Sequence, residues 1–246
     1  MEGITVRLLP WDTRDGPHNM AADEAMLHSA AAAHIASLRF YGWTPATLSL
    51  GYFQSASARL TNPLHAALPW VRRPTGGATL VHDCEATYAL ALPPGPPWHA
   101  VEPWMPRTHR IIAEALTTLG VPKRLALVEK PNRPGNVLCF QQHTPGDLVC
   151  DSAKIVGSAQ RKHRRALLQH GGILLAQSRY TPQLPGLREL TGTTLSAPDV
   201  EAAIVAAFET VTGWTVTRGD WTKEERQQID TLASEKYGTA TWNEKR

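Results

Sequence analysis

The chain has 246 residues, of which 42% are hydrophobic and 19% are charged, and its formal net charge is +3. This composition is typical of a globular protein and excludes a disordered chain, and the small net charge gives no ground for a nucleic-acid-binding function. No apolar run approaches membrane-spanning length and no targeting segment is recognisable, so we expect a cytoplasmic protein without membrane association.

The first third of the chain predicts one helix followed by several strands. Residues 16–34 place most of their apolar side chains on one side of a helix, and Asn19 is the expected N-cap. Strand-like runs follow at residues 37–43, 47–52 and 70–74. The glycine turn at residues 76–77 then leads into two extended segments, which end at the proline-rich residues 93–97.

The remaining chain mixes helices and strands without regular alternation. A second helix is expected from about Pro106 to Gly120, and residues 131–146 form a loop rich in proline and glycine. Three consecutive antiparallel strands are expected at residues 147–150, 153–160 and 166–175, and late helices at residues 196–213 and from Thr222, with a Thr222–Glu225 capping box. This order predicts an α+β fold, with a mostly antiparallel or mixed sheet flanked by helices, in one domain spanning residues 1–246.

The predicted strand at residues 153–160 carries an isolated lysine near its start. Strict alternation puts Lys154, Val156, Ser158 and Gln160 on one face and Ile155, Gly157 and Ala159 on the other. The first face is polar at most positions, which fits either a solvent-exposed edge or the wall of a pocket, and the strand pattern by itself favours the edge. Glycine weakens a strand interior, so Gly157 indicates that something approaches the backbone closely there.

A second candidate site lies in the segment "RRPTGGATLVHD", residues 72–83. Gly76 and Gly77 allow backbone conformations that other residues resist and leave amides accessible to a ligand. Arg72 and Arg73 precede them and could hold a carboxylate or a phosphate, and His82 follows one strand length later. The spacing matches neither a P-loop nor a dinucleotide-binding fingerprint, and a simple glycine hairpin explains it equally well.

Together these segments resemble the biotin/lipoate protein ligase-like family, which covers lipoate ligases and octanoyltransferases. The resemblance is carried by "NMAADEAML", "LSLGYFQ", "RRPTGGATLVHD", "DLVCDSAKIVGSAQRK", "LLQHGGILL" and "KYGTATWN", in that order. It implies a catalytic domain with neither an N-terminal DNA-binding domain nor a C-terminal accessory domain. In this family the glycine loop and the lysine strand enclose a medium-chain acyl group, and the lysine, here Lys154, approaches its carbonyl.

Within the family, "HDCEATYAL" and the position of Cys139 are similar to the octanoyltransferase branch that acts through a loop cysteine. Cys139 is followed by Phe140 and precedes Lys154 by fifteen positions. The resemblance therefore implies that Cys139 is the acyl-bearing nucleophile and that Lys154 orients and activates it, while Cys84 and Cys150 are interpreted as structural thiols. The proposed pocket or support residues are Arg72, Arg73, Gly76, Gly77, His82, Gly157, Ser158, Gln160, His170 and Gly171, although His170 fits a structural core position equally well.

The implied reaction moves an octanoyl group from acyl carrier protein, through a cysteine thioester, to a lysine of a lipoyl domain. Thioester exchange conserves the energy of the bond, so no ATP, other cofactor or metal is expected, and a nearby ammonium stabilises a thiolate. Backbone amides near Gly77 and Gly157 could stabilise the oxyanion. Two departures from the family pattern are Ala78 after the glycine pair and Gly146-Asp147 where ligases usually carry Asn-Asp.

The basic residues Arg161, Lys162, Arg164 and Arg165 fall at the expected tip between two strands. Such a run is usually a solvated turn, but it could also attract the acyl carrier protein and the lipoyl domain, which are typically acidic. The chain is expected to be a monomer. Two alternatives remain open from the sequence: an ATP-dependent lipoate ligase, which would need ATP and Mg, and a non-catalytic acyl or lipoyl-domain binding protein.

Overall fold

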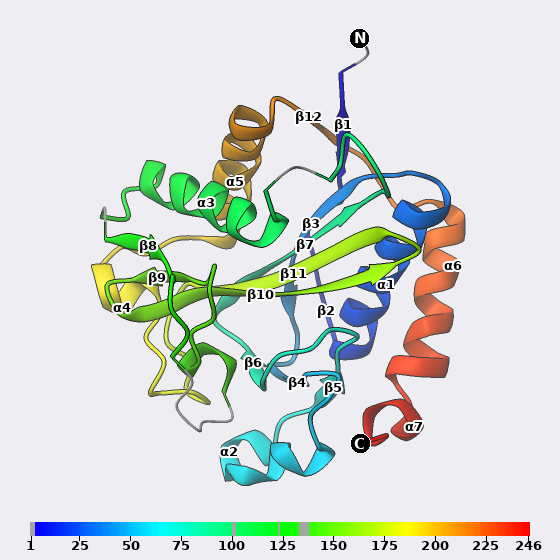
Figure 1. Cartoon of the computed structure of the whole chain (residues 1–246). Coiled ribbons are helices and arrows are strands. Elements are labelled where there is room, and N and C mark those ends of the chain that lie inside the picture. Colours follow the sequence, from blue (N-terminus) through cyan, green and yellow to red (C-terminus); the bar gives the residue numbers. More distant parts are fainter. Residues whose placement is uncertain (1–2, 100–101, 123, 133–137) are drawn as a thin grey trace.

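The structure of the protein is a computed structural model that describes residues 3–99, 102–122, 124–132 and 138–246. Its larger sheet has the strand order β12-β1-β3-β7-β11-β10-β9-β8, with β2 paired to β3 (Figure 1). The strands are β1 Thr5–Leu8, β2 Asp12–Arg14, β3 Ser37–Trp43, β7 Glu85–Leu92, β8 Leu125–Leu127, β9 Leu148–Cys150, β10 Ala153–His163, β11 Ala166–Leu174 and β12 Thr215–Arg218. The run from β3 through β7, β11, β10 and β9 to β8 is antiparallel, whereas β1 pairs in parallel with β3 and β12, so the sheet is mixed.

A smaller sheet lies below the larger one in Figure 1. It has the order β5-β4-β6, formed by β4 Thr47–Leu50, β5 Trp70–Arg72 and β6 Leu80–His82. The connection from β4 to β5 contains a 3₁₀ turn, η1 Ala56–Thr61, and the short helix α2 Pro63–Ala66. The two sheets, together with the helices, confirm the expected α+β class.

Helices cover both faces of the larger sheet (Figure 1). On one face lie α1 Gly16–Ala32 and α6 Lys223–Leu232, continued by the π turn η3 Ala233–Tyr237 and by α7 Ala240–Asn243. On the other face lie α3 Trp104–Thr118 and α5 Ala197–Thr212, with α4 Leu187–Thr191 near the sheet edge. Among the described residues, no helix is both long enough and apolar enough to cross a membrane.

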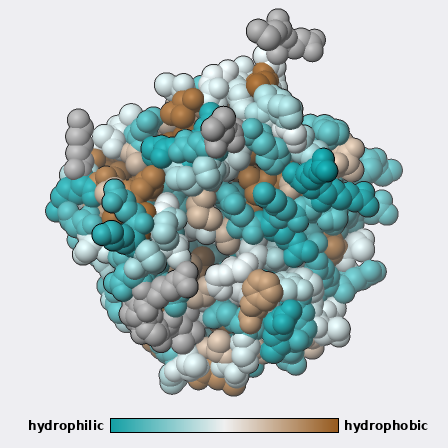
Figure 2. Space-filling model, in the orientation of Figure 1, coloured by the Kyte–Doolittle hydropathy of each residue, from teal (hydrophilic) through white to brown (hydrophobic). Residues whose placement is uncertain are grey.

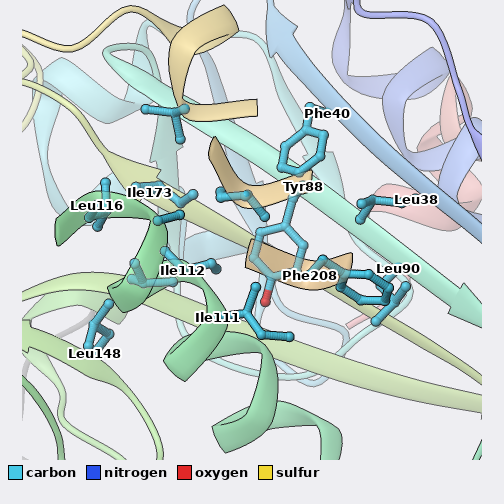
Figure 3. Packing of buried hydrophobic residues seen from close by; sticks show 14 of the residues in the cluster. Leu38, Phe40, Tyr88, Leu90, Ile111, Ile112, Leu116, Leu148, Ile173 and Phe208 are labelled. Atoms are coloured by element: carbon cyan, nitrogen blue, oxygen red, sulfur yellow. The ribbon is translucent and has the colours of Figure 1, made fainter. Parts of the chain in front are cut away.

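Strand alternation explains how one sheet supports two hydrophobic cores. On β7, Tyr88 and Leu90 face α3 and α5, where they pack with Ile111, Ile112 and Phe208 (Figure 3). The intervening Ala89 and Ala91 face α1 and belong to the second core. Their small side chains let α1 pack close to the sheet, since successive side chains of a strand point to opposite faces.

Helix boundaries follow the capping chemistry with one correction. The N-cap of α1 is Asp15, whose carboxylate accepts a hydrogen bond from the His18 amide, and not Asn19. Asn19 lies inside the helix, is buried, and donates to the carbonyls of Arg14 and Gly42, which ties α1 to β3. The expected Thr222 capping box of α6 is present.

Candidate active site

The lysine strand contains a β-bulge that changes which side chains share a face. The pairing of β10 with β9 shifts register between Lys154 and Val156, so Ile155 and Val156 both pack in the core beside α3. Beyond the bulge, Gly157 lies on the same face as Lys154. The expected face of Lys154, Val156, Ser158 and Gln160 is therefore wrong, because one extra residue reverses the alternation downstream.

Gly157 is required by the lysine side chain itself. A Cβ atom at position 157 would lie 2.5 Å from Cε and 2.9 Å from Nζ of Lys154. The close approach that the sequence predicted at Gly157 is thus made by Lys154, which is 5% exposed.

Lys154 lies next to Cys139, although fifteen residues separate them in the sequence. Its Nζ is 3.8 Å from Cys139 Sγ and donates to the carbonyls of Cys139 and Gln142 at 3.3 and 3.2 Å. Cys139 begins the short turn η2 Cys139–Gln141, and its amide donates to the carbonyl of Thr79. The turn is therefore fixed to the segment that follows the glycine pair, which keeps the thiol beside the ammonium.

Asp147 is a further site residue, which was not among those predicted from the sequence. Its Oδ2 is 2.7 Å from Lys154 Nζ, and both side chains are buried. The same oxygen accepts hydrogen bonds from the amide and hydroxyl of Thr144. A carboxylate at the start of the apolar run "DLVC" was the available signal, since a buried charge needs a partner.

The Arg73 side chain stabilises the glycine turn by hydrogen bonds to its backbone. Its guanidinium donates to the carbonyls of Gly76 and Ala78 and to the backbone and hydroxyl oxygens of Ser49. Gly77 has a φ of +94°, and a Cβ there would contact Arg73, so glycine is required. Burial lowers the pKa of Arg73, and the nearby Cys139 acts in the opposite direction.

His82 continues this network away from the turn. Its Nε2 is 2.8 Å from Ser49 Oγ, and its Nδ1 donates to Glu85. The ring stacks on Trp43 with centroids 3.8 Å apart. Ser49 thus links the imidazole to the guanidinium of Arg73, and His82 lines the inner part of the pocket.

His170 stabilises the residue before the glycine turn, Thr75, by a side-chain hydrogen bond. Its Nδ1 donates to Asp23 of α1 at 2.7 Å, and its Nε2 is 2.7 Å from the hydroxyl of Thr75. Because Thr75 immediately precedes Gly76, the imidazole joins the turn to α1. Both interpretations of His170 hold, since it is 5% exposed and also lines the pocket.

A pocket in two connected parts lies between β10 and the glycine turn. Counting space open to solvent, the inner part has a volume of about 450 Å³ and the outer part about 650 Å³. The lining of the inner part is mainly apolar and includes Met20, Tyr41, Trp43 and Leu80. The lining of the outer part includes Gly76, Lys154 and Gln160. Cys139 lines both parts, so it lies where the two parts adjoin. Figure 2 shows a hollow near the centre of this face of the molecule.

Ser158 and Gly171 border the pocket, and they also contact the buried residues on the side of the sheet that faces α3. The hydroxyl of Ser158 contacts Tyr88 OH and His109 Nε2, each at 2.6 Å. A Cβ at Gly171 would clash with that hydroxyl. Gln160, which borders the outer part of the pocket, donates to Gln169. The side chains of Ser158 and Gln160 are therefore held mainly by protein partners.

The buried network behind β10 perturbs two pKa values. Burial lowers the pKa of His109 to about 4, although its hydrogen bond to the Gly146 carbonyl acts against the shift. Burial raises the pKa of Tyr88 to about 12. Both side chains are therefore neutral at physiological pH, and His109 links the pocket wall to the turn that carries Asp147.

Arg72 is not placed for substrate binding, contrary to expectation. Its guanidinium donates to the carbonyls of Gly51, Tyr52, Gln54 and Asn243, and it lines neither part of the pocket. Adjacent residues of a strand point to opposite faces, so only one of the two arginines can face the glycine turn. Arg72 instead fastens α7 to the small sheet.

The basic cluster forms a hairpin tip as expected, but the tip does not border the Cys139–Lys154 pair. Lys162, Arg164 and Arg165 are exposed at the end of β10, about 30 Å from Lys154 at ~3.3 Å per residue. Arg161 differs, because its guanidinium donates to the carbonyl of Pro74 and so braces the glycine turn. The role of the tip in partner docking stays a prediction.

Neither of the other two cysteines lines the pocket. Cys150 is fully buried in β9 and Cys84 is half-buried, and burial raises the pKa of both thiols. Within the described ranges, no group of three or more His, Cys, Asp or Glu side chains is arranged to hold a metal ion.

Comparison with known proteins identifies the family to which this site belongs. Residues 15–209 match the lipoyl protein ligase A/B catalytic domain. The chain belongs to this family. Octanoyltransferase LipM of Kyrpidia tusciae is 32% identical over 97% of this chain and 98% of that protein, and octanoyltransferase LipM of Bacillus subtilis is 30% identical over the full length of both.

A solved structure shows the same fold. Protein Ta0514 of T. acidophilum, with bound lipoic acid, has a TM-score of 0.78 to this chain at 21% identity, covering 99% of this chain and 100% of that one. The expected relationship to lipoyl protein ligase A/B catalytic domains is therefore confirmed, and so is the expected fold.

Proposed function

We propose that the protein is an octanoyltransferase of lipoate biosynthesis that carries the acyl group on Cys139. The observation that carries this proposal is the position of Lys154 Nζ, 3.8 Å from Cys139 Sγ, where the apolar pocket opens to its mouth. The full-length relatives are octanoyltransferases, and the sequence expectation of an acyltransferase is confirmed by them. They disfavour the ATP-dependent ligase alternative.

In the first half-reaction, the Cys139 thiolate attacks the thioester carbonyl of octanoyl-acyl carrier protein. A bond forms between Sγ and the carbonyl carbon, the bond to the carrier sulfur breaks, and that sulfur leaves as a thiol after taking up a proton. The Lys154 ammonium stabilises the thiolate and then the negative charge on the carbonyl oxygen. Its hydrogen bonds to Asp147 and to two loop carbonyls fix its position, and one of the carbonyl contacts is exchanged for the substrate oxygen.

In the second half-reaction, the lysine amine of a lipoyl domain attacks the octanoyl-Cys139 thioester. An amide bond forms, the carbon–sulfur bond breaks, and the proton lost by the amine returns to the thiolate, with Lys154 as the nearest group able to relay it. The apolar inner pocket holds the octanoyl chain during both steps, and each buried methylene contributes about 0.8 kcal/mol. No ATP or metal enters the sequence of steps.

Intact mass measurement with octanoyl-acyl carrier protein, without ATP, tests the proposal. The wild type is expected to gain one octanoyl group, which Cys139→Ala abolishes. Cys150→Ala serves as the matched control and retains the adduct, because Cys150 is buried in β9. Adding a lipoyl domain should then move the octanoyl group to its lysine.

Two results would contradict the proposal. An adduct that persists in Cys139→Ala would assign the acyl group to another residue. Lipoylation of a lipoyl domain that strictly depends on ATP, with no acyl adduct on the protein, would establish the ligase alternative instead. Absence of both activities would leave a non-catalytic binding role.

A further inference from the structure

Exposed apolar side chains gather on the connection between β4 and β5. Among the described residues, four large hydrophobic side chains are exposed, and three of them, Phe53, Leu60 and Leu64, lie within twelve positions of one another. Phe53 is 73% exposed, Leu60 57% and Leu64 48%. We refer to residues 52–66, which include η1 and α2, as the α2 lobe. Exposed apolar clusters of this kind mark interaction surfaces.

The α2 lobe is attached to the mouth of the pocket. The amide of Tyr52 donates to the carbonyl of Thr75, and Gln54 hydrogen-bonds Thr79, so both sides of the glycine turn are tied to the lobe. A Cβ at Gly76, which lines the mouth, would lie 3.8 Å from the ring of Phe53. From this contact the lobe extends away from the sheet to α2 at the lower edge of Figure 1, where Figure 2 shows hydrophobic side chains.

The surroundings of the lobe are positively charged. No aspartate or glutamate occurs between residues 25 and 82. Arg59 lies over the ring of Trp70, and the C-terminal segment brings Arg246 over Phe53 and Lys245 over Tyr52. None of these three cations forms a salt bridge in the part of the chain that the structure describes. Glu244 is the neighbouring carboxylate in sequence, so the cluster keeps a net positive charge.

We infer that the α2 lobe docks the acidic carrier domain that delivers the octanoyl thioester, an inference that rests on the proposed function. The basic charge and the exposed apolar side chains complement an acidic surface with apolar contacts at its centre. The flexible prosthetic arm of an acyl carrier is several times longer than a lysine side chain. Because Phe53 of the lobe adjoins Gly76, which lines the same outer pocket as Cys139, a donor docked on the lobe lies beside the opening through which such an arm enters.

The experiment compares a carrier-bound donor with a small one. The variants Leu64→Ser, Arg59→Glu and their combination are reacted with octanoyl-acyl carrier protein and, separately, with the octanoyl thioester of N-acetylcysteamine. The rate of adduct formation on Cys139 is followed by mass. We expect the combined variant to react at least about tenfold more slowly with the carrier donor at low salt, with the difference shrinking as salt rises. Its reaction with the small thioester should equal that of the wild type.

Matched variants make the outcome specific. Val211→Ser changes an exposed hydrophobic residue of α5, on the opposite side of the molecule, and should leave both rates unchanged. Arg164→Glu with Arg165→Glu tests the hairpin tip as the rival docking surface. If the tip variant loses the carrier reaction while the lobe variant keeps it, the inference is overturned.

Two further results would also overturn it. An equal loss with both donors would mean that the lobe supports the site rather than docking a partner. A loss restricted to transfer from octanoyl-enzyme to the lipoyl domain would assign the lobe to the acceptor. Failure of the wild type to react with either donor would instead contradict the proposed function, so the two failures are distinguishable.

Discussion

The side chain of Lys154 occupies the space that a Cβ atom at Gly157 would require. The two residues share a face only because β10 has one extra residue between Lys154 and Val156, where it pairs with β9. The lysine can therefore lie flat along its own strand and place its ammonium between Asp147 and Cys139. One backbone irregularity thus decides the position of the proposed catalytic cation.

Gly157→Ala is expected to displace that ammonium. The added methyl overpacks a buried position and costs about 1–3 kcal/mol in the free energy of unfolding. Displacement by about 1 Å should slow acylation of Cys139 by about 100-fold, measured in a single turnover. Gly3→Ala is the control, because no atom lies within 4 Å of the added Cβ, and both quantities should stay at the wild-type value. If Gly157→Ala is acylated at the same rate as the wild type, the position of the lysine is not critical for this step.

Asp147→Asn should leave the buried ammonium of Lys154 without its carboxylate. Breaking a buried ion pair by removing one partner costs about 3–5 kcal/mol, and the acylation rate should fall as well. Denaturant titration and single-turnover acylation measure the two effects. Asp151→Asn is the matched control, since its ion pair with Arg124 is nearly half exposed and contributes at most about 1 kcal/mol. If both variants lose the same free energy of unfolding, burial does not make the Asp147–Lys154 ion pair more important for stability than the exposed Asp151–Arg124 pair.

His109 should make the protein less stable as the pH falls from about 6.5 towards 4. Its folded-state pKa of about 4 lies below the ordinary value of 6.5, so the unfolded chain binds the proton more readily. Stability from the neutral imidazole is complete above pH 6.5 and is lost through this window, by up to about 3 kcal/mol. His109→Gln should flatten this part of the curve of unfolding free energy against pH. His34→Asn, at an exposed position, should leave it unchanged.

The neighbouring arginines should respond differently to the same substitution. Arg72→Lys loses the guanidinium hydrogen bonds to Asn243 of α7 and to the carbonyls of Tyr52 and Gln54, so the free energy of unfolding should fall by about 1.5–3 kcal/mol or more, while the KM for the octanoyl thioester of N-acetylcysteamine is unchanged. Arg73→Lys loosens the carbonyls of Gly76 and Ala78, and the KM should rise severalfold. Comparing unfolding curves with steady-state kinetics separates the two roles. A raised KM for Arg72→Lys would place it in the site after all.

Much of the fold follows from local sequence patterns. The three strands that carry Lys154 and His170 are present where alternation and turn residues predicted them, and the Thr222 capping box begins α6. Local patterns succeed here because strand periodicity and capping depend on residues close in the chain. The start of α1 was misplaced because Asn19 is a good N-cap residue by type, whereas its amide is used in a tertiary contact.

The family, the type of chemistry and the candidate pair Cys139 and Lys154 can all be predicted from the motifs, because their order and spacing carry that information. Which side chains line the pocket depends on the fold. The bulge at Ile155 reversed the predicted faces, Arg72 turned to α7 while Arg73 turned to the glycine turn, and Asp147 emerged as the partner of Lys154. These assignments depend on register and on contacts between distant segments, which no local pattern encodes.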